Sequence, residues 1–251
     1  MTSLFANFFP PEVVTFVSDR RVDYAREGNQ GKLSHPQNFF LAEQLNLRLP
    51  EVVTSCQVHS EQILFVTQQI LKDSVFQEEA DGLLTSDTDL PLGIRTADCL
   101  PIFFYDIKKK GVGLAHAGWK GSVKRIAVGM ISLMQSRLDS KPQDIQIAFG
   151  PCIRPCCYEV TQEFSAYFPE GVTQRNGSYY LDLAKVNKLE LLRLGIQEKN
   201  IFDCLACTCC DKKYFSYRRD GIHTGRMLSL IMLRGEKNKD NSYAYRDFCH
   251  R

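Results

Sequence analysis

The chain has 251 residues, 44% of them apolar, and its 31 basic and 29 acidic residues give a net charge of +2. This length and apolar fraction predict a single domain over residues 1–251 with a sizeable core. The near balance of charge gives no argument for nucleic acid or a membrane surface as a partner. No apolar run approaches the roughly 18 residues that cross a bilayer, and the N-terminus lacks a signal-peptide pattern, so we expect a soluble, cytoplasmic protein.

The first half of the chain predicts a loop, a helix and then strands. Residues 19–36 are polar and aperiodic, which indicates a long loop, and apolar spacing predicts a helix over 38–45. Short apolar runs predict strands at 52–53, 63–67, 81–86, 100–105 and 111–116. Three lysines in the linker between the last two runs indicate a hairpin with a solvated tip.

In the second half, helical and strand patterns alternate. Apolar residues at helical spacing predict helices over 122–136, 161–167 and 183–194, the last ended by Gly195. Further apolar runs predict strands at 145–149, 201–204 and 214–217, and a last apolar segment follows at 227–233. The tail, 234–251, is polar enough that we expect part of it to be disordered. This mixture indicates an α/β (α+β) fold with a mixed central sheet flanked by helices.

Three residues stand out as a candidate site: His59, Cys99 and His116, each in a short stretch beside a predicted strand. Two imidazoles and one thiolate suit a borderline-soft metal such as zinc. Three protein ligands leave a position for water or substrate, as in catalytic rather than structural zinc sites. Their separations of 40 and 17 residues do not follow a zinc-finger pattern, so the site would be assembled from the ends of separate strands.

The same residues admit plainer interpretations. A histidine beside a strand is more often a hydrogen-bonded structural residue than a ligand. Cys99 could be buried, or it could be a nucleophile paired with a histidine. The glycines of G-W-K-G at 118–121 would let the backbone approach the site closely, and they precede a helix whose N–H groups could bind an anion. The residues alone therefore predict a Cys/His site, with or without a metal.

Several linked motifs resemble those of the YfiH-type family, which is labelled multicopper polyphenol oxidase (laccase) and understood as purine nucleoside phosphorylase. The motifs lie in the family's order between residues 57 and 233: Q-V-H-S, A-D-G-L-L-T, T-A-D-C-L-P, H-A-G-W-K-G, G-P-C-I-R-P-C-C-Y-E-V, C-T and S-Y-R-R-D-G-I-H-T-G-R. The resemblance implies a single α/β domain with a mixed sheet, similar to toxin deamidases. It also implies metal ligation by His59, Cys99 and His116, with zinc as the cofactor and copper as the alternative.

The resemblance weakens in the early substrate loop. The family's T-T-R-x-G-G stretch matches V-S-D-R-R-V-D here, without the paired glycines, so Arg20 is the candidate active-site arginine and Arg21 is next. Arg20 would act catalytically and bind phosphate through its planar guanidinium. Asn38, in P-Q-N-F-F, matches the asparagine of the family's N-R pair before a helix, here without the arginine, and it is a candidate substrate contact. Asp98 would either accept a proton or hydrogen-bond the backbone of a tight turn, and Trp119 would either anchor the core or stack on a purine.

The resemblance implies phosphorolysis of adenosine, guanosine, inosine and methylthioadenosine, together with deamination of adenosine. An open zinc site suits deamination because it lowers the pKa of a bound water to about 7. Phosphorolysis instead requires phosphate beside the ribose anomeric carbon. Purine nucleosides and phosphate are thus the expected partners, with no nucleic acid and no membrane. The sequence does not fix the oligomeric state, for which a homodimer is one option.

Rival functions follow from the same residues. A copper polyphenol oxidase would have two histidines and one cysteine of a blue-copper site, but the usual axial Met is not evident, and multicopper chemistry needs more histidines than the five in the chain. A metal-free Cys99–His116 hydrolase or deamidase is the second rival. A non-enzymatic binding protein with a vestigial site is the third.

Ten cysteines are a high count for a chain without a signal sequence, where reduced thiols, metal ligation or burial are expected rather than disulfides. Four of them lie close together: Cys204, Cys207, Cys209 and Cys210. No complementary pair stands at finger spacing unless Cys152, Cys156 and Cys157 supply it, so a second metal is not expected. Cys207 belongs to the C-T motif, and we expect the other three to be local elaboration or core residues.

Overall fold

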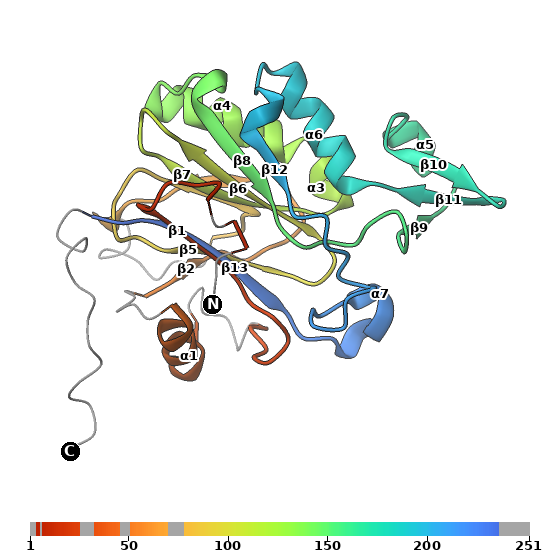
Figure 1. Cartoon of the computed structure of the whole chain (residues 1–251), viewed down its shortest axis with the longest axis horizontal. Helices are drawn as coiled ribbons and strands as arrows, with labels where there is room; N and C mark the ends of the chain where they lie inside the picture. Colours follow the sequence, from red (N-terminus) through yellow and green to blue (C-terminus); the bar gives the residue numbers. More distant parts are fainter. Residues whose placement is uncertain (1–3, 6, 26–32, 46–50, 70–77, 236–251) are drawn as a thin grey trace.

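The computed structural model describes residues 4–5, 7–25, 33–45, 51–69 and 78–235 (Figure 1). Its six-stranded sheet has the order β12 (Ile201–Asp203), β8 (Ile145–Phe149), β6 (Leu100–Asp106), β7 (Val112–Ala117), β4 (Gly82–Thr85) and β3 (Ile63–Phe65). The β12–β8 and β3–β4 pairs are parallel and the other neighbours are antiparallel. The predicted mixed sheet is therefore confirmed.

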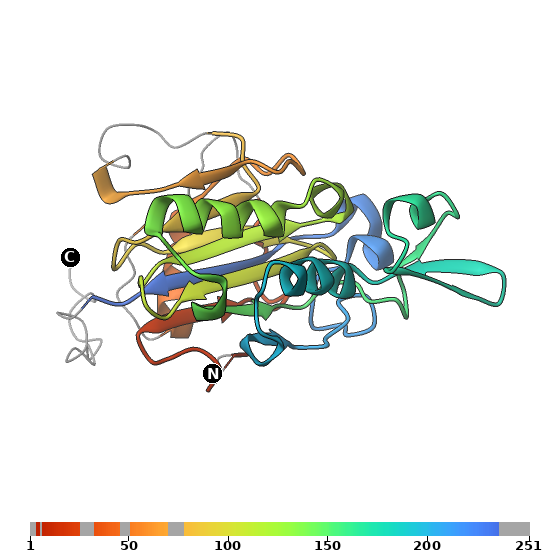
Figure 2. The ribbon, with the colours of Figure 1, turned by 90° about the horizontal axis from the view of Figure 1, so that it is seen from above.

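Two smaller sheets complete the strands of the described residues. A four-stranded sheet has the order β1 (Val13–Val17), β13 (Met227–Leu233), β5 (Leu92–Thr96) and β2 (Val53–Thr54). A three-stranded sheet has the order β10 (Val172–Arg175), β11 (Ser178–Leu181) and β9 (Glu159–Val160). Figure 2 shows this three-stranded sheet projecting from one end of the molecule.

The helices lie outside the sheets. Those that the structure describes in full are α1 (His35–Leu45), α3 (Trp119–Val123), α4 (Ile126–Leu138), α5 (Phe164–Tyr167), α6 (Leu183–Arg193) and α7 (Tyr217–Asp220), with 3-10 turns at Pro142–Asp144, Glu198–Asn200 and Gly221–His223. Figure 1 shows α4 and α6 on one side of the sheets and α1 on the opposite side. No helix among the described residues is long and apolar enough to cross a membrane.

The alternation of side chains along β6 explains the layers. All seven residues of this strand are buried, as expected for a strand covered on both faces. Ile102 and Phe104 belong to the core beneath α4 and α6, whereas Phe103 and Tyr105 belong to the core between the two larger sheets. A third core, which contains Leu41 of α1, lies on the outer face of the four-stranded sheet. The order of layers is therefore helices, sheet, sheet, helix.

The predicted helix over 122–136 is two helices, α3 and α4. The chain breaks between them at Arg125, whose φ of +61° lies in the left-handed region. The guanidinium of Arg125 pairs with Glu190 of α6 at 2.8 Å, while Ile126 and Ala127, the first residues of α4, are buried. Tertiary contacts therefore override the helical pattern at this point.

Two further predictions are wrong. Residues 214–217 form no strand; Tyr214 and Phe215 pack against Met227 in a small cluster, and Ser216 caps α7 by accepting the N–H of Arg219. The helix predicted over 161–167 is only the short α5, preceded by β9. Strands β1, β5, β9, β10 and β11 were not predicted. The helix over 183–194 is confirmed as α6, with Gly195 following it at φ +89°.

Two predicted loops fall partly outside the described residues. Within 19–36, the structure describes 19–25 and 33–36, and the last two residues already belong to α1. Of the tail, only 234–235 is described. The prediction of disorder in the rest of the tail lies outside the described residues.

Candidate active site

Three side chains that are distant in sequence meet where β5 ends and β6 begins. His59 lies in the turn after β2, Cys99 lies between β5 and β6, and His116 lies in β7. One imidazole nitrogen of each histidine and the sulfur of Cys99 all lie within 4.8 Å of one another. The sulfur of Cys99 is 3.9 Å from Nε2 of His59, and the two imidazole centroids are 4.8 Å apart. The fold therefore brings together the three residues that the sequence singled out.

A buried carboxylate, Asp81, positions both histidines. Oδ1 of Asp81 lies 2.7 Å from Nδ1 of His116, on the strand that pairs with β4. The same carboxylate accepts the backbone N–H groups of Val58, His59 and Ser60 at 3.1, 3.0 and 2.6 Å. Because Nδ1 of His116 is bonded to Asp81, Nε2 is the ring nitrogen that faces Cys99 and His59 and can bind a metal. Metal-binding histidines are commonly oriented by such a hydrogen bond at the other ring nitrogen.

Charge in the site centres on Cys99 and His116. Desolvation raises the pKa of the Cys99 thiol, but the imidazoles of His116 and His59 lower it to about 6. Desolvation lowers the pKa of His116, while Cys99 and Asp81 raise it to about 9. Burial also raises the pKa of Asp81, yet hydrogen bonds from His116 and Ser60 lower it to about 2. In the metal-free protein these groups therefore form a thiolate, an imidazolium and a carboxylate near neutral pH.

The backbone is constrained at three positions beside the site. His59 has φ +60° and Asp98 has φ +84°, in a region that residues with a Cβ seldom adopt. A Cβ at Gly118 would lie 2.9 Å from the sulfur of Cys99 and 3.2 Å from Cδ2 of His59. The backbone at residue 118 passes so close to Cys99 and His59 that only a glycine fits, as the glycines of the H-A-G-W-K-G motif indicated.

A cavity of about 800 Å³ opens beside the three side chains. This volume lies within the range of small-molecule sites. The aromatic and cationic residues of its lining are Trp119, Tyr158, Tyr217, Arg95, Arg218 and Arg226. The cavity can therefore offer flat apolar walls to a ring and positive charge to an anion.

Asp98 lines the cavity and is fully engaged in hydrogen bonds. Its Oδ1 accepts the hydroxyl of Thr208, and its Oδ2 accepts the backbone N–H of Arg218, both at 2.6 Å. Its backbone carbonyl accepts the N–H of Ile153 at 2.9 Å. These bonds match the alternative in which Asp98 organises the backbone around a tight turn, and its proton-accepting role stays a prediction.

Of the other predicted substrate residues, Trp119 lies at the cavity, whereas Arg20 and Asn38 lie elsewhere. Trp119 lines the cavity and also packs on Phe164, with ring centroids 5.1 Å apart, so it is both a wall and a core anchor. Arg20 is exposed, and its guanidinium lies 5.6 Å from the ring centroid of Phe215. Asn38 lies in α1 and donates to the carbonyl of Leu33. Neither Arg20 nor Asn38 is among the described residues that line the cavity.

Sequence reasoning did not assign a role in the site to Asp81, Arg95 or Arg226. Each stands in or directly beside a family motif: Asp81 in A-D-G-L-L-T, Arg95 before T-A-D-C-L-P, and Arg226 at the end of S-Y-R-R-D-G-I-H-T-G-R. Arg95 is buried, and its guanidinium donates to the carbonyl of Tyr24 and the hydroxyl of Thr54. The motifs were a usable signal, but strand pairing was needed to show which side chains meet.

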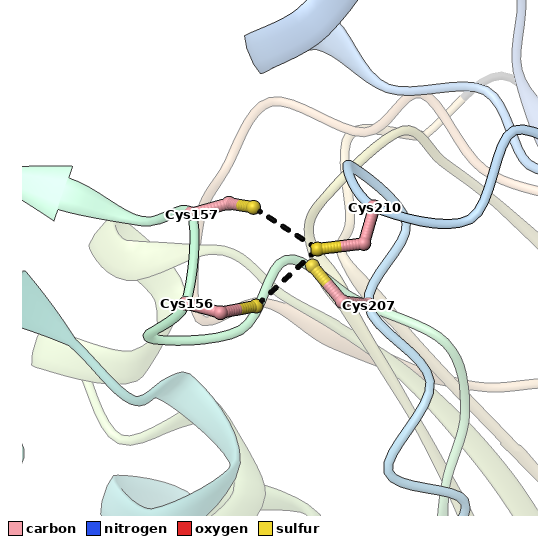
Figure 3. Close-up of side chains that lie close together, drawn as sticks. All are labelled: Cys156, Cys157, Cys207 and Cys210. Carbon is pink, nitrogen blue, oxygen red and sulfur yellow. Dashed lines mark hydrogen bonds between the residues drawn. The ribbon is translucent and has the colours of Figure 1, made fainter.

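The fold divides the cysteine-rich segment in two. Cys204 and Cys209 pack against the apolar cores, as expected. Cys207 and Cys210 instead meet Cys156 and Cys157, and their four sulfur atoms lie within 4.8 Å of one another (Figure 3). Cys156 and Cys157 therefore supply the complementary pair that finger spacing did not reveal. Cys210 is exposed in this group, so it is not a core residue.

Comparisons with known proteins agree with the motifs. A family model described as multi-copper polyphenol oxidoreductase laccase matches residues 35–234. Purine nucleoside phosphorylase YlmD of Geobacillus stearothermophilus is 37% identical over 212 residues, which cover 78% of this chain and 77% of YlmD. The crystal structure of YlmD from that organism has a TM-score of 0.80 at 32% identity, covering 92% of this chain and 94% of that one.

Two other proteins are similar over most of the chain. Adenosine deaminase RL5, from an unknown prokaryotic organism, is 32% identical over 206 residues, which cover 76% of this chain and 78% of RL5. The crystal structure of the Bacillus licheniformis hypothetical protein YfiH has a TM-score of 0.77 at 30% identity, covering 89% of this chain and 93% of that one. The predicted resemblance to YfiH-type proteins and the predicted fold class are confirmed.

Proposed function

The chain belongs to the family described as multi-copper polyphenol oxidoreductase laccase, and we propose that it is a zinc-dependent purine nucleoside phosphorylase with adenosine deaminase activity. One observation carries the proposal: the His59, Cys99 and His116 group opens onto a cavity of about 800 Å³ that also contains aromatic and arginine side chains. A purine nucleoside needs a flat apolar wall, and phosphate needs cations. Adenosine, guanosine, inosine and methylthioadenosine are the proposed substrates.

The three side chains fit a catalytic zinc ion. Two imidazole nitrogens and a thiolate are borderline-soft donors, and three protein ligands leave one position for substrate or water. The Asp81–His116 hydrogen bond of 2.7 Å directs Nε2 of His116 toward the other two donors. When bound, zinc would supply a Lewis acid beside the substrate.

The cavity residues would do the remaining work. The aromatic rings of Trp119 and Tyr158 would contact the purine and would exclude water from the glycosidic bond. Arg226 and Arg218 place guanidinium groups at the cavity, where they would hold phosphate for attack on the anomeric carbon. Arg20, favoured by the family resemblance, is a competing candidate for the phosphate.

Product analysis with adenosine tests the proposal. Purified protein of known metal content would be incubated with adenosine, with and without phosphate, and the products separated by chromatography. Phosphate-dependent release of adenine, lost in His59→Ala and Cys99→Ala, is the expected result. Inosine formed without phosphate would reflect the deaminase activity. If zinc-loaded protein forms neither product, the purine assignment is wrong.

Zinc is proposed over copper because of the donor set. A blue-copper site usually adds a weak axial methionine, and no methionine is found among the described residues that line the cavity. The chain also has only five histidines in total, fewer than multicopper oxidation needs. Reconstituting the metal-free protein with zinc or copper and comparing phosphorolysis with phenol oxidation distinguishes the two.

A metal-free hydrolase is the second candidate, and one observation favours it. Asp81 hydrogen-bonds His116, which lowers the pKa of Cys99, so the three residues are connected in the order of a cysteine hydrolase triad. Alkylation separates the two functions. Zinc should protect Cys99 and preserve phosphorolysis, whereas a cysteine hydrolase would lose its activity to iodoacetamide and would not need zinc.

A further inference from the structure

The four sulfur atoms of Figure 3 come from two loops that leave neighbouring parallel strands. Cys156 and Cys157 follow β8, and Cys207 and Cys210 follow β12, which pairs with β8 in parallel. The loops continue side by side past the strands, because Cys152 and Cys207 form a parallel bridge. Strand pairing therefore holds the two cysteine pairs face to face.

The spacing of the sulfur atoms matches a tetrahedral metal site. Cys210 is 3.6 Å from Cys156 and 3.2 Å from Cys157, measured between sulfur atoms, and all four sulfur atoms lie within 4.8 Å of one another. In a tetrahedron with zinc–sulfur bonds of about 2.3 Å, the sulfur atoms are about 3.8 Å apart. A disulfide would instead require about 2.05 Å, and all four cysteines are free thiols.

The surroundings of the group suit a negatively charged metal–thiolate centre. Zinc with four thiolates carries a net charge of −2. Three arginines bind the carbonyls of the same two loops: Arg218 at Cys157, Arg219 at Cys209 and Arg175 at Pro155. Their guanidinium groups place positive charge near the four cysteines, and because they bond to carbonyl oxygens they leave the sulfur atoms available to a metal.

The group is open to solvent. Cys156 and Cys210 are exposed, so an ion can reach the four sulfur atoms from outside. Thiolate is the form in which cysteine binds metal, so binding would release protons from the free thiols.

We propose that Cys156, Cys157, Cys207 and Cys210 bind a zinc ion in a closed structural site, distinct from the His59–Cys99–His116 group. Four protein ligands leave no position for substrate, so this zinc would hold structure rather than react. Its two loops carry part of the active-site wall. Tyr158 adjoins Cys157 and lines the cavity, and Thr208 adjoins Cys207 and donates to Asp98.

Metal content of purified protein, grown with zinc and handled with a thiol reductant, is the first test. We expect two zinc ions per wild-type chain, one in the double variant Cys207→Ser/Cys210→Ser, and two in Cys209→Ser, the matched control from the same loop. The double variant His59→Ala/Cys99→Ala should retain one zinc, which reports on the four-cysteine site alone. Equal zinc in wild type and Cys207→Ser/Cys210→Ser would overturn the proposal.

X-ray absorption at the zinc edge tests wild-type protein without any variant, so it is decisive even if the cysteine variants fail to fold. With both sites filled, zinc should have an average of about 2.5 sulfur neighbours at about 2.3 Å. An average of about one would leave only the His59–Cys99–His116 site and would overturn the four-cysteine site. Iron in place of zinc, or two disulfides in metal-free protein prepared with reductant, would also overturn it.

Thermal unfolding of His59→Ala/Cys99→Ala shows whether the site is structural. Because that variant lacks the other ligands, any effect of a chelator belongs to the four cysteines. We expect the chelator to lower its Tm by several degrees and zinc to restore it. An unchanged Tm in protein that loses zinc would overturn the structural role.

Discussion

Asp81 is the residue on which the geometry of the site depends most. Its buried carboxylate bonds His116 at 2.7 Å and also accepts N–H groups from the turn that contains His59. His59 has a left-handed backbone, which is costly without such support. One carboxylate therefore fixes the ring of one proposed ligand and the backbone of another.

Replacing Asp81 with Asn should lower zinc affinity at the active site by about 10- to 100-fold, as loss of an outer carboxylate does elsewhere. Competition with a chromophoric chelator would measure the change. Asp87→Asn is the matched control, because Asp87 accepts the N–H of Gln68 away from the site. Equal affinity in wild type and Asp81→Asn would show that Asp81 does not orient His116.

The low pKa of Asp81 predicts how stability depends on pH. Its folded pKa of about 2 lies below the ordinary 3.8, so its contribution is fully present above pH 3.8 and is lost as pH falls through 2. The contribution is about 2 kcal/mol. Urea unfolding of metal-free protein between about pH 5 and pH 2 should show the gap between wild type and Asp81→Asn closing in acid. A gap that is constant over this range would contradict the prediction.

Gly118→Ala should weaken zinc binding because its Cβ would meet the sulfur of Cys99 at 2.9 Å and His59 at 3.2 Å. Either the ligands must move or the chain must shift, and we expect at least a tenfold loss of affinity (about 1.4 kcal/mol). Gly129→Ala in α4 is the control, because its Cβ meets only the terminal carbon of Ile63, at 3.3 Å. Metal titration followed by calorimetry measures both, and similar affinities in the two variants would contradict the argument.

At the scale of elements, α6 shows how local sequence fixes a boundary. Asp182 accepts the N–H of Lys185 at the start of the helix, and Gly195 follows its end in the left-handed region. Asp182→Ala should cost about 1 kcal/mol, or about 2–4 °C in Tm for a chain of this size. Asp182→Asn keeps a capping oxygen and should remain near wild type. Calorimetry that finds both variants equally stable would rule out the cap as the cause.

Elements with strong local patterns were predictable. The continuous apolar run of β6 and the capped, periodic α6 were recognised within a residue or two. Tyr214 and Phe215 were misassigned as a strand, because an apolar pair gives no information on whether a neighbouring strand exists to pair with it. The break at Arg125 depends on Glu190, 65 residues away, so no local pattern could reveal it.

The candidate site was predictable to a similar extent. The motifs identified His59, Cys99 and His116, and the structure brings them together. Asp81 was not singled out, because its role depends on the pairing of β4 with β7. The second cysteine group was considered but not expected, because its halves, at 156–157 and 207–210, meet only through the parallel pairing of β8 and β12.

At the scale of the whole molecule, the cavity gathers cations from distant parts of the chain. Arg226 lines it directly before β13, whereas Arg20 lies over Phe215 and is not among the described lining residues. We therefore expect Arg226→Gln to raise the KM for phosphate about tenfold or more, because a charged hydrogen bond contributes about 1.5–3 kcal/mol. Arg20→Gln should have a smaller effect. Phosphate kinetics at saturating adenosine would decide, and a larger effect at Arg20 would favour the assignment from family resemblance.

The position of β13 has a consequence for the order in which the protein can fold. This strand, Met227–Leu233, lies between β1 and β5 in the four-stranded sheet although it comes late in the chain. A ribosome delivers β1 and β5 long before the strand that joins them. Cys99 lies three residues after β5, so its thiol stays close to an unpaired sheet edge until β13 has been synthesised. During synthesis the nascent chain should therefore be prone to aggregate through the unpaired edge of β5 and to be oxidised at Cys99. Once β13 pairs with β5 in the folded protein, that edge is no longer available.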